Sequence, residues 1–179
     1  MIEERMMPAD NLIIRLALNS DLDEIRDIYN HFVRTSIYTM DLDEKSQEEM
    51  KAWLASHTGR FPAYVATINN KIIGIASLSK WAERRGYYPS CEASIYLSPD
   101  IESQGQGDVL LRCLIDTAKE NDFSCIISFM TSINKLARNL VRRNNFTFVG
   151  TMKNVAFKFN RAVDMDIYQY IIKLPNKNE

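Results

Sequence analysis

The stretch "CEASIYLSPDIESQGQGDVLL", residues 91–111, contains a strand, a turn and the start of a helix in immediate succession. Residues 91–97 alternate as a β-strand does, and the two faces would be Cys91, Ala93, Ile95 and Leu97 against Glu92, Ser94 and Tyr96. Pro99 ends the strand, and apolar residues at helical spacing run from about Gly107 to Asn121. The rest of the chain is arranged around this strand, turn and helix.

The turn has the backbone chemistry of an anion site. Gly105 and Gly107 allow the backbone to approach a ligand closely, and a helix start offers free N–H groups and about half a positive charge. A phosphate can bind there without a basic side chain. A G-x-G turn is equally typical of an ordinary tight turn. The same stretch carries Asp100, Glu102 and Asp108 and contains no Lys or Arg.

The other predicted elements build a mixed sheet. Residues 12–18 alternate as a strand, and Asn19–Asp21 offer caps for a helix. Ser46 and Glu49 form a capping box for a second helix, and Asn69-Asn70 predicts a hairpin turn.

The downstream part alternates between strands and helices. The apolar run "CIISFM", 125–130, predicts a central strand buried on both faces, and a helix follows over 134–143. Strands over 147–159 and 163–172 meet at a turn near Asn160. The fold class is therefore α/β, with a mixed sheet and helices on its faces.

The whole-chain properties describe a globular protein. The chain has 179 residues, of which 46% are hydrophobic and 25% charged, so we expect a single domain over 1–179 with residues 1–10 as a flexible tail. The net charge of −1 argues against nucleic-acid or anionic-membrane partners. No secretory signal and no apolar run of about 20 residues is visible.

The cysteines indicate a reducing compartment. Cys91, Cys113 and Cys125 are odd in number and match no zinc-site or CxxC spacing. We expect buried free thiols, no metal site and a cytoplasmic location.

Glu92 is the candidate chemical group of the strand. A carboxylate within a mostly apolar strand either points to water or lines a cleft. If it is desolvated, its pKa rises above about 4.3 and approaches values useful for a general base. Spacing alone leaves both interpretations open.

Three stretches carry a resemblance to a known family. They are "IYNHFVRTS" (28–36), "WAERRGYYPSCEASIYLSP" (81–99) and "FKFNRAVDM" (157–165). Together with the turn, they resemble the GNAT superfamily of acyl-CoA-dependent N-acyltransferases, and most closely its phosphinothricin N-acetyltransferase branch. The similarity covers about residues 12–173.

The resemblance implies a fold and a set of roles. The fold is a twisted mixed sheet of about seven strands with helices on both faces, splayed between the fourth strand, 91–97, and the fifth, about 124–130. The arm of the cosubstrate acetyl-CoA enters that gap. Glu92 acts as general base on the amine of a small amino-acid-like substrate. The implied cofactor contacts are Ile95, Tyr96, Leu97, Gln104, Gly105, Gln106, Gly107, Asp108 and Asn134. The implied substrate contacts are Phe32, Thr35, Arg84 and Tyr87.

The sequence also departs from the family pattern. Glu102 stands where the family usually has Gln or Arg, and Asp108 where it often has Ser or Thr. Val141 matches a position where many members carry Tyr, and this branch often His, as general acid. Such departures are compatible with a slower enzyme, and they leave the acceptor amine unnamed.

Two interpretations of the acidic turn remain open. In one, Asp108 caps the helix, Glu102 points to solvent, and backbone N–H groups bind the anion. In the other, the acyl-CoA site is weakened, and compensation comes from basic residues near the next helix, namely Lys135, Arg138, Arg142 or Arg143.

Three function classes follow. The first is an acetyl-CoA-dependent N-acetyltransferase acting on a small amine. The second is a catalytically weakened acyl-CoA or small-molecule binding protein on the same fold, and the third is a structural or interaction protein. Dimerisation is common in this branch, so a homodimer is a further expectation.

Overall fold

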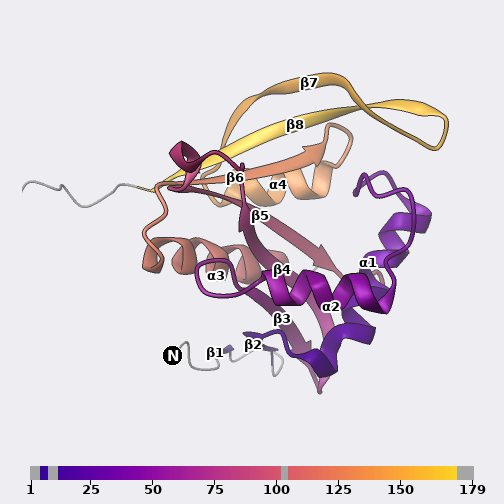
Figure 1. Ribbon diagram of the computed structural model, residues 1–179, viewed down its shortest axis with the longest axis vertical. Helices are drawn as coiled ribbons and strands as arrows, with labels where there is room; N and C mark the ends of the chain where they lie inside the picture. The colour runs from indigo at the N-terminus through magenta and orange to yellow at the C-terminus, as the bar shows by residue number, and fades with distance from the viewer. Residues whose placement is uncertain (1–4, 8–11, 102–104, 173–179) are drawn as a thin grey trace, which may run out of the picture.

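The computed structural model describes residues 5–7, 12–101 and 105–172. Figure 1 shows a twisted sheet with helices packed against it and a long C-terminal hairpin. The helices and strands are β1 Arg5–Met7, β2 Leu12–Leu16, η1 Asn19–Asp21, α1 Leu22–Thr35, α2 Gln47–Ser56, β3 Ala63–Ile68, β4 Lys71–Lys80, η2 Arg85–Tyr87, β5 Ser90–Leu97, α3 Gln106–Glu120, β6 Cys125–Thr131, α4 Lys135–Arg143, β7 Thr147–Lys158 and β8 Arg161–Ile171.

The described strands form one mixed sheet in the order β1-β2-β3-β4-β5-β6-β8-β7. β5 and β6 pair in parallel, whereas the other neighbours pair antiparallel. The predicted fold class, a mixed sheet with helices on both faces, is confirmed. The N-terminus differs from the prediction of a tail over residues 1–10, because Arg5–Met7 pairs with β2 as an additional edge strand.

Local sequence signals account for several element boundaries. The capping box before α2 is present: the Glu49 N–H donates to Ser46 Oγ at 3.2 Å, and the Ser46 N–H donates to Glu49 Oε2 at 2.8 Å. Asn69 and Asn70 both have positive φ, 50° and 63°, as the hairpin between β3 and β4 requires. The tight turn between β7 and β8 likewise places Asn160 at a φ of 56°.

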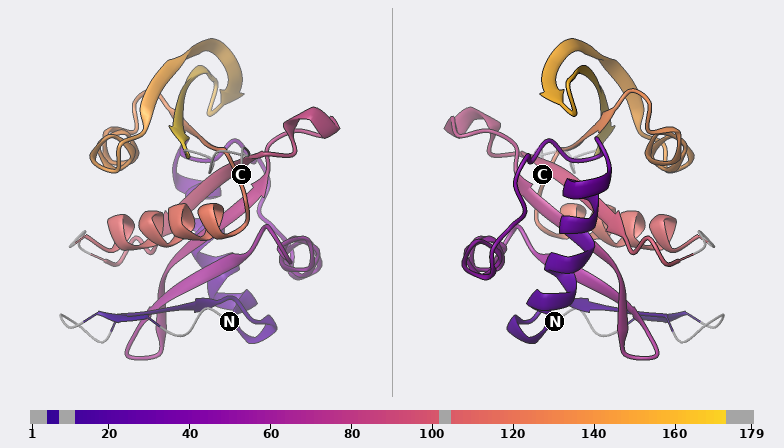
Figure 2. Two further views of the ribbon diagram at one scale, coloured as in Figure 1. Left: turned by 90° about the vertical axis from the view of Figure 1, so that its left-hand side faces the viewer. Right: turned by 90° about the vertical axis from the view of Figure 1, so that its right-hand side faces the viewer.

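The pleat of the central strands divides the core into two layers. On one face Ala76, Leu78 and Ala93 pack with the apolar side of α3. On the other face Val65 and Ile75 pack with apolar residues of α1 and α2. Figure 2 shows α3 on one side of the sheet and α2 on the other. The two layers place different helices over the two faces of β5.

The parallel pair β5–β6 separates after three residues. Ser90, Cys91 and Glu92 pair with β6, and the register given for the pair ends at Glu92↔Ile127. β6 continues instead along β8, with seven paired positions from Cys125 to Thr131. The predicted splay between the strand at 91–97 and the strand at about 124–130 is thus present.

The burial of β6 reflects this opening. The sequence predicts a strand buried on both faces, yet the structure alternates: Ile126, Ser128 and Met130 are buried, while Ile127 and Phe129 are half-buried. The prediction is wrong in this respect, because beyond Ile127 the strand borders an opening rather than a paired neighbour.

Gly74 provides a test of the packing around β5. A Cβ at this position would lie 2.8 Å from Leu97 Cδ2 and 2.9 Å from Leu110 Cδ1. We expect Gly74→Ala to lower the free energy of unfolding by about 1–2 kcal/mol, because the buried ends of the Leu97 and Leu110 side chains must shift. Urea unfolding measures the change. Gly86→Ala, with open space around its Cβ, should change stability by less than about 0.5 kcal/mol, and equal effects of both variants would contradict the packing argument.

Candidate functional site

A cleft lies where β5 and β6 separate. Its volume is about 420 Å³, and its wall includes both strands, the start of α3 and one side of α4. The residues of the two strands and the following turn that line it are Ala93, Ser94, Ile95, Tyr96, Leu97, Ser98, Pro99, Ile101, Ser128, Phe129 and Met130. A volume of this size suits a small molecule or the narrow arm of a larger one.

The start of α3 forms one end of the cleft. Gly105 is the N-cap residue and has a φ of 95°, a left-handed conformation that favours glycine. No side chain caps this helix start within the described part of the chain. Gly107 lines the cleft, and a Cβ there would lie 3.3 Å from Leu140 Cδ2 of α4. Glycine therefore permits the turn at 105 and close packing of two helices at 107.

Asp108 does not act as the helix cap, contrary to one of the two interpretations of the acidic turn. Its carboxylate accepts hydrogen bonds at 2.8 Å from Arg143 Nη2 and at 2.8 Å from Asn144 Nδ2, at the end of α4. The Arg143 guanidinium and the Asn144 amide hold the pKa of Asp108 below its ordinary value. Arg143 is one of the four basic residues that could compensate for the acidic turn. It is paired with Asp108, which lines the cleft. Glu102 lies outside the described residues.

α4 begins and ends at the cleft. Asn134 is its N-cap: Asn134 Oδ1 accepts a hydrogen bond from the Ala137 N–H at 3.0 Å. Val141 lines the cleft and is 4% exposed. Its side chain has no proton to donate, so the wall at this position is apolar.

Glu92 occupies the last paired position before the strands separate. Its Cα partners are Ser79 on β4 and Ile127 on β6. Nearby, the rings of Trp81 and Phe129 stack at 5.1 Å. Burial raises the pKa of the Glu92 carboxyl above its ordinary value. The carboxylate is therefore half-buried and more basic than a solvated glutamate.

A second cavity of about 500 Å³ lies on the α1 and α2 side of the sheet. Ser94 and Tyr96 line both this cavity and the cleft. Ser79 of β4, which is paired with Glu92 in the sheet, also lines the second cavity. In the described part of the chain, Glu92 itself lines neither space, but it shares a face of β5 with Ser94 and Tyr96. A group held in the second cavity would thus reach β5 from the face that carries Glu92.

A comparison with known protein families identifies the family to which this fold belongs. Residues 14–167 match the family model for an acetyltransferase (GNAT) domain. The chain belongs to the GNAT family. GNAT acetyltransferases use acetyl-CoA as the cosubstrate, so the expected enzyme class and cosubstrate are confirmed at the level of the family.

Curated relatives place the GNAT chain near amino-acid acetyltransferases. It is 31% identical to a phosphinothricin N-acetyltransferase of Streptomyces coelicolor, over 87% of this chain and 94% of the relative. It is 28% identical to an L-methionine sulfoximine/L-methionine sulfone acetyltransferase of Salmonella typhimurium, over 88% of this chain and 93% of the relative. The predicted resemblance to the phosphinothricin acetyltransferase branch is confirmed.

A solved GNAT structure shows the same architecture. The phosphinothricin acetyltransferase of Sinorhizobium meliloti, crystallised with acetyl-CoA, superposes with a TM-score of 0.87 at 28% identity, covering 93% of this chain and 94% of that one.

The residues predicted to bind cofactor in this GNAT domain gather largely at the cleft. Those that line it are Ile95, Tyr96, Leu97, Gly107, Asp108 and Asn134. Gly105 and Gln106 adjoin it at the start of α3, whereas Gln104 lies outside the described residues. Their contacts with acetyl-CoA stay predictions.

The residues predicted to bind substrate are more scattered. Phe32 lines the cleft, beside Tyr38. Thr35 is exposed, and its hydroxyl donates to the His31 carbonyl at 2.6 Å. Arg84 and Tyr87 are exposed at η2, and within the described residues neither lines the cleft or the second cavity.

Sequence reasoning missed a cluster of polar residues that joins the two spaces. The Tyr29 hydroxyl lies 2.7 Å from Thr39 Oγ1 and donates to Asp41 Oδ2 at 2.5 Å. The Tyr96 ring packs edge-on against the Tyr29 ring, with the ring centroids 5.0 Å apart, and burial raises the pKa of Tyr96. The available signal was weak: Tyr29 lies one turn before Phe32 on α1, whereas Thr39 and Asp41 lie in a loop without a recognisable pattern.

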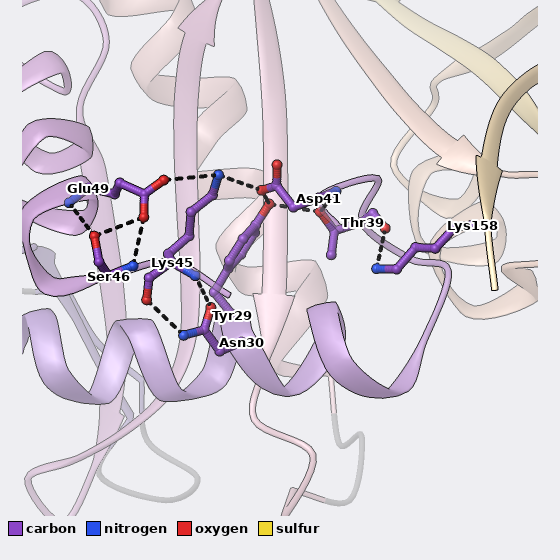
Figure 3. A network of polar contacts seen from close by, with 8 residues as sticks. All are labelled: Tyr29, Asn30, Thr39, Asp41, Lys45, Ser46, Glu49 and Lys158. Atoms are coloured by element: carbon purple, nitrogen blue, oxygen red, sulfur yellow. Dashed lines mark hydrogen bonds and ion pairs between the residues drawn. The ribbon is translucent and has the colours of Figure 1, made fainter. Parts of the chain in front are cut away.

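Lys158 anchors this loop from a distant part of the chain. Its ammonium donates to the Thr39 carbonyl at 3.0 Å, and the residue is 3% exposed. Figure 3 shows the side chain reaching the loop between α1 and α2. Burial lowers the pKa of this lysine, and the nearby Asp41 opposes that effect. The end of β7 thus completes the surroundings of Thr39.

The described residues contain neither a candidate metal site nor a membrane-spanning helix. No group of three or more His, Cys, Asp or Glu side chains there is arranged to hold a metal ion. Among the helices of that same part of the chain, none has the length and apolar character needed to cross a membrane.

The pairing of Asp108 predicts a pH-dependent contribution to stability. We expect Asp108→Asn to lower the free energy of unfolding at pH 7 by about 0.5–1 kcal/mol, through loss of a partly exposed ion pair. The folded-state pKa of Asp108 is depressed, so the contribution is present above the pKa of the unfolded carboxyl and is lost as the pH falls through the folded pKa.

Urea titrations from pH 7 to pH 3 check this expectation. Asp116→Asn removes a more exposed ion pair, with Lys119, within the same helix and serves as the control. A difference between wild type and Asp108→Asn that stayed constant down to pH 3 would argue against the assigned ion pair.

Proposed function

We propose that the protein transfers an acetyl group from acetyl-CoA to the amine of a small amino-acid-like substrate. The observation that carries the proposal is the separation of β5 from β6 directly after Glu92. This separation provides a cleft for a thioester arm, and it places a half-buried carboxylate at the last paired position before the strands part.

The cosubstrate would lie along the unpaired part of β5. Backbone groups of Ile95 and Leu97 on the β6 side have no strand partner in the described register, so they can pair with the amide groups of a pantetheine arm. The pyrophosphate would rest at the start of α3, around Gly105 and Gly107, where backbone N–H groups and the helix dipole favour an anion. Arg143, paired with Asp108, offsets the carboxylate at this position.

Glu92 would act as the general base, directly or through a water molecule. An amine with a pKa of about 10 is protonated at pH 7 and cannot attack a thioester until it loses a proton. The raised pKa of the Glu92 carboxyl makes it a better proton acceptor than an ordinary glutamate. The neutral amine then attacks the acetyl carbonyl, the C–S bond breaks, and the CoA thiolate leaves.

Return of a proton to the thiolate would use water, since Val141 occupies the position of the usual acid. A thiol in water has a pKa of about 8.5 and is a good leaving group, so the reaction can proceed without a side-chain acid. Val141 also favours a second candidate function, that of a GNAT-fold acyl-CoA binding protein with weakened catalysis. Binding of acetyl-CoA by calorimetry, without thiol release on any amine of an acceptor panel, would support that alternative.

The role of Glu92 can be tested by Glu92→Gln. We expect kcat/KM to fall by about 10²–10⁴-fold, because the amide cannot accept the proton, while the affinity for acetyl-CoA is retained. In the wild type, kcat/KM should fall as the pH drops through a pKa above that of an ordinary glutamate, since only the ionised carboxylate is the base. The test is thiol release measured across pH, with Glu83→Gln, at an exposed glutamate between β4 and η2, as the control. Equal rates for Glu92→Gln and wild type would remove Glu92 from the mechanism.

We further propose that residues 1–179 form a single acetyltransferase domain in the cytoplasm. The three cysteines are free, which suits a reducing compartment. A homodimer is supported by a group of exposed apolar side chains on β7, namely Phe148, Val149, Val155 and Phe157.

A charge introduced into this group should oppose self-association. We expect Phe157→Glu, at a side chain that is 65% exposed, to convert a dimer to a monomer in size-exclusion chromatography with light scattering. Lys51→Glu, at an exposed position on α2, is the control and should leave the mass unchanged. A wild-type protein that is monomeric at high micromolar concentration would contradict the dimer.

A further inference from the structure

The second cavity has a composition that selects among acceptors. It lies between α1, α2, β4 and β5, and it meets the cleft at Ser94 and Tyr96. Its volume of about 500 Å³ is enough for an amino-acid side chain. The inference below rests on the proposed function, because it takes the group in this cavity to belong to the acceptor.

The charged residues of the cavity wall have a negative balance. Lys45 is the single cation among the described residues that line it, against the two carboxylates of Asp41 and Glu49. The Lys45 ammonium lies 3.2 Å from Asp41 Oδ2 and 3.9 Å from Glu49 Oε1. Figure 3 shows Lys45 between these two acids. The ammonium is therefore already matched by carboxylates and would have to leave them to bind another anion.

Neighbouring groups do not reverse this balance. The His57 Nε2 atom lies 3.2 Å from Ser79 Oγ, and burial lowers the pKa of His57, so the ring is neutral at pH 7. Lys158 directs its ammonium to the Thr39 carbonyl and is not a lining residue. Glu92, on the same face of β5 as Ser94, adds a further carboxylate nearby.

The remainder of the wall suits an uncharged group with hydrogen-bonding capacity. Apolar surface comes from Ile25, Met50, Ala52, Trp53 and Ile75, and hydroxyl groups come from Tyr29, Ser56, Ser77, Ser79, Ser94 and Tyr96. The protons of Tyr29 and Ser56 are already donated to Asp41 and to the Trp53 carbonyl, but hydroxyl groups such as those of Ser77 and Ser94 can donate to a neutral oxygen or nitrogen at little cost. An anionic group would lose its hydration and meet like charges instead.

We propose that this cavity binds the side chain of the acceptor and selects an uncharged, hydrogen-bonding side chain over an anionic one. A sulfone or sulfoximine belongs to the favoured class, and a phosphinate to the disfavoured class. The protein should therefore acetylate phosphinothricin less efficiently than a neutral amino acid of the same shape.

Two acceptors of nearly the same shape test the proposal. L-methionine sulfone and phosphinothricin each carry a methyl group and two oxygens on the end atom of the side chain, and they differ by one negative charge. We expect kcat/KM for the sulfone to exceed that for phosphinothricin by at least about tenfold at low salt, with a smaller ratio in high salt. Binding of each compound to the protein saturated with CoA, measured by calorimetry, should show the same order.

Paired variants separate charge from shape. Glu49→Gln keeps the capping interaction with Ser46, since glutamine can replace glutamate there, but removes a lining charge. It should reduce the preference for the sulfone about threefold or more. Glu48→Gln makes the same change at the adjacent exposed position of α2, outside the lining, and should leave the preference unchanged.

A filling variant tests the location. Ser77→Leu places a larger side chain in the cavity wall and should abolish binding of the sulfone while CoA still binds. Equal affinities for the two acceptors, a preference for phosphinothricin, or full sulfone binding by Ser77→Leu would each overturn the proposal. Selective sulfone binding without acetylation would support the cavity assignment while contradicting the proposed enzymatic activity.

Discussion

The hydrogen bonds of a single strand, β6, determine the architecture of this protein. A strand in a sheet has two edges, and β6 uses one of them along its full length with β8, while the other edge pairs with only three residues of β5. The rest of β5 is held from its far side by β4, from Gly74 to Lys80. Beyond Glu92 and Ile127, each strand is therefore stabilised by one neighbour, and the sheet can remain open there without losing its overall order.

The opening is useful because the two faces of β5 belong to different layers. The face with Ala93 packs into the core covered by α3, whose first turn borders the cleft. The opposite face carries Glu92, Ser94 and Tyr96, and it is covered by α1 and α2. A cosubstrate and an acceptor can thus approach one strand from two sides and meet where it is unpaired.

Much of this arrangement could be predicted from the sequence, because it depends on local patterns. Alternation at 91–97, the capping box at Ser46 and Glu49, and the Asn69-Asn70 turn are short-range signals, and each has the expected structure. The wall of the second cavity was not foreseen, since it depends on contacts between distant segments. The pairing of Asp108 with Arg143 has the same cause: sequence offered several basic candidates, and only the packing of α4 against α3 brings one of them into contact.

The contact between Lys158 and Thr39 joins residues 119 positions apart in the chain. It means that the loop after α1, although synthesised early, acquires its final support only when the last strand pair is made. A ribosome-bound chain that ends before this lysine has the helices and most of the sheet, but it lacks the ammonium that holds the loop in place. Translation thus completes the surroundings of this loop last, after the strands that line the cleft.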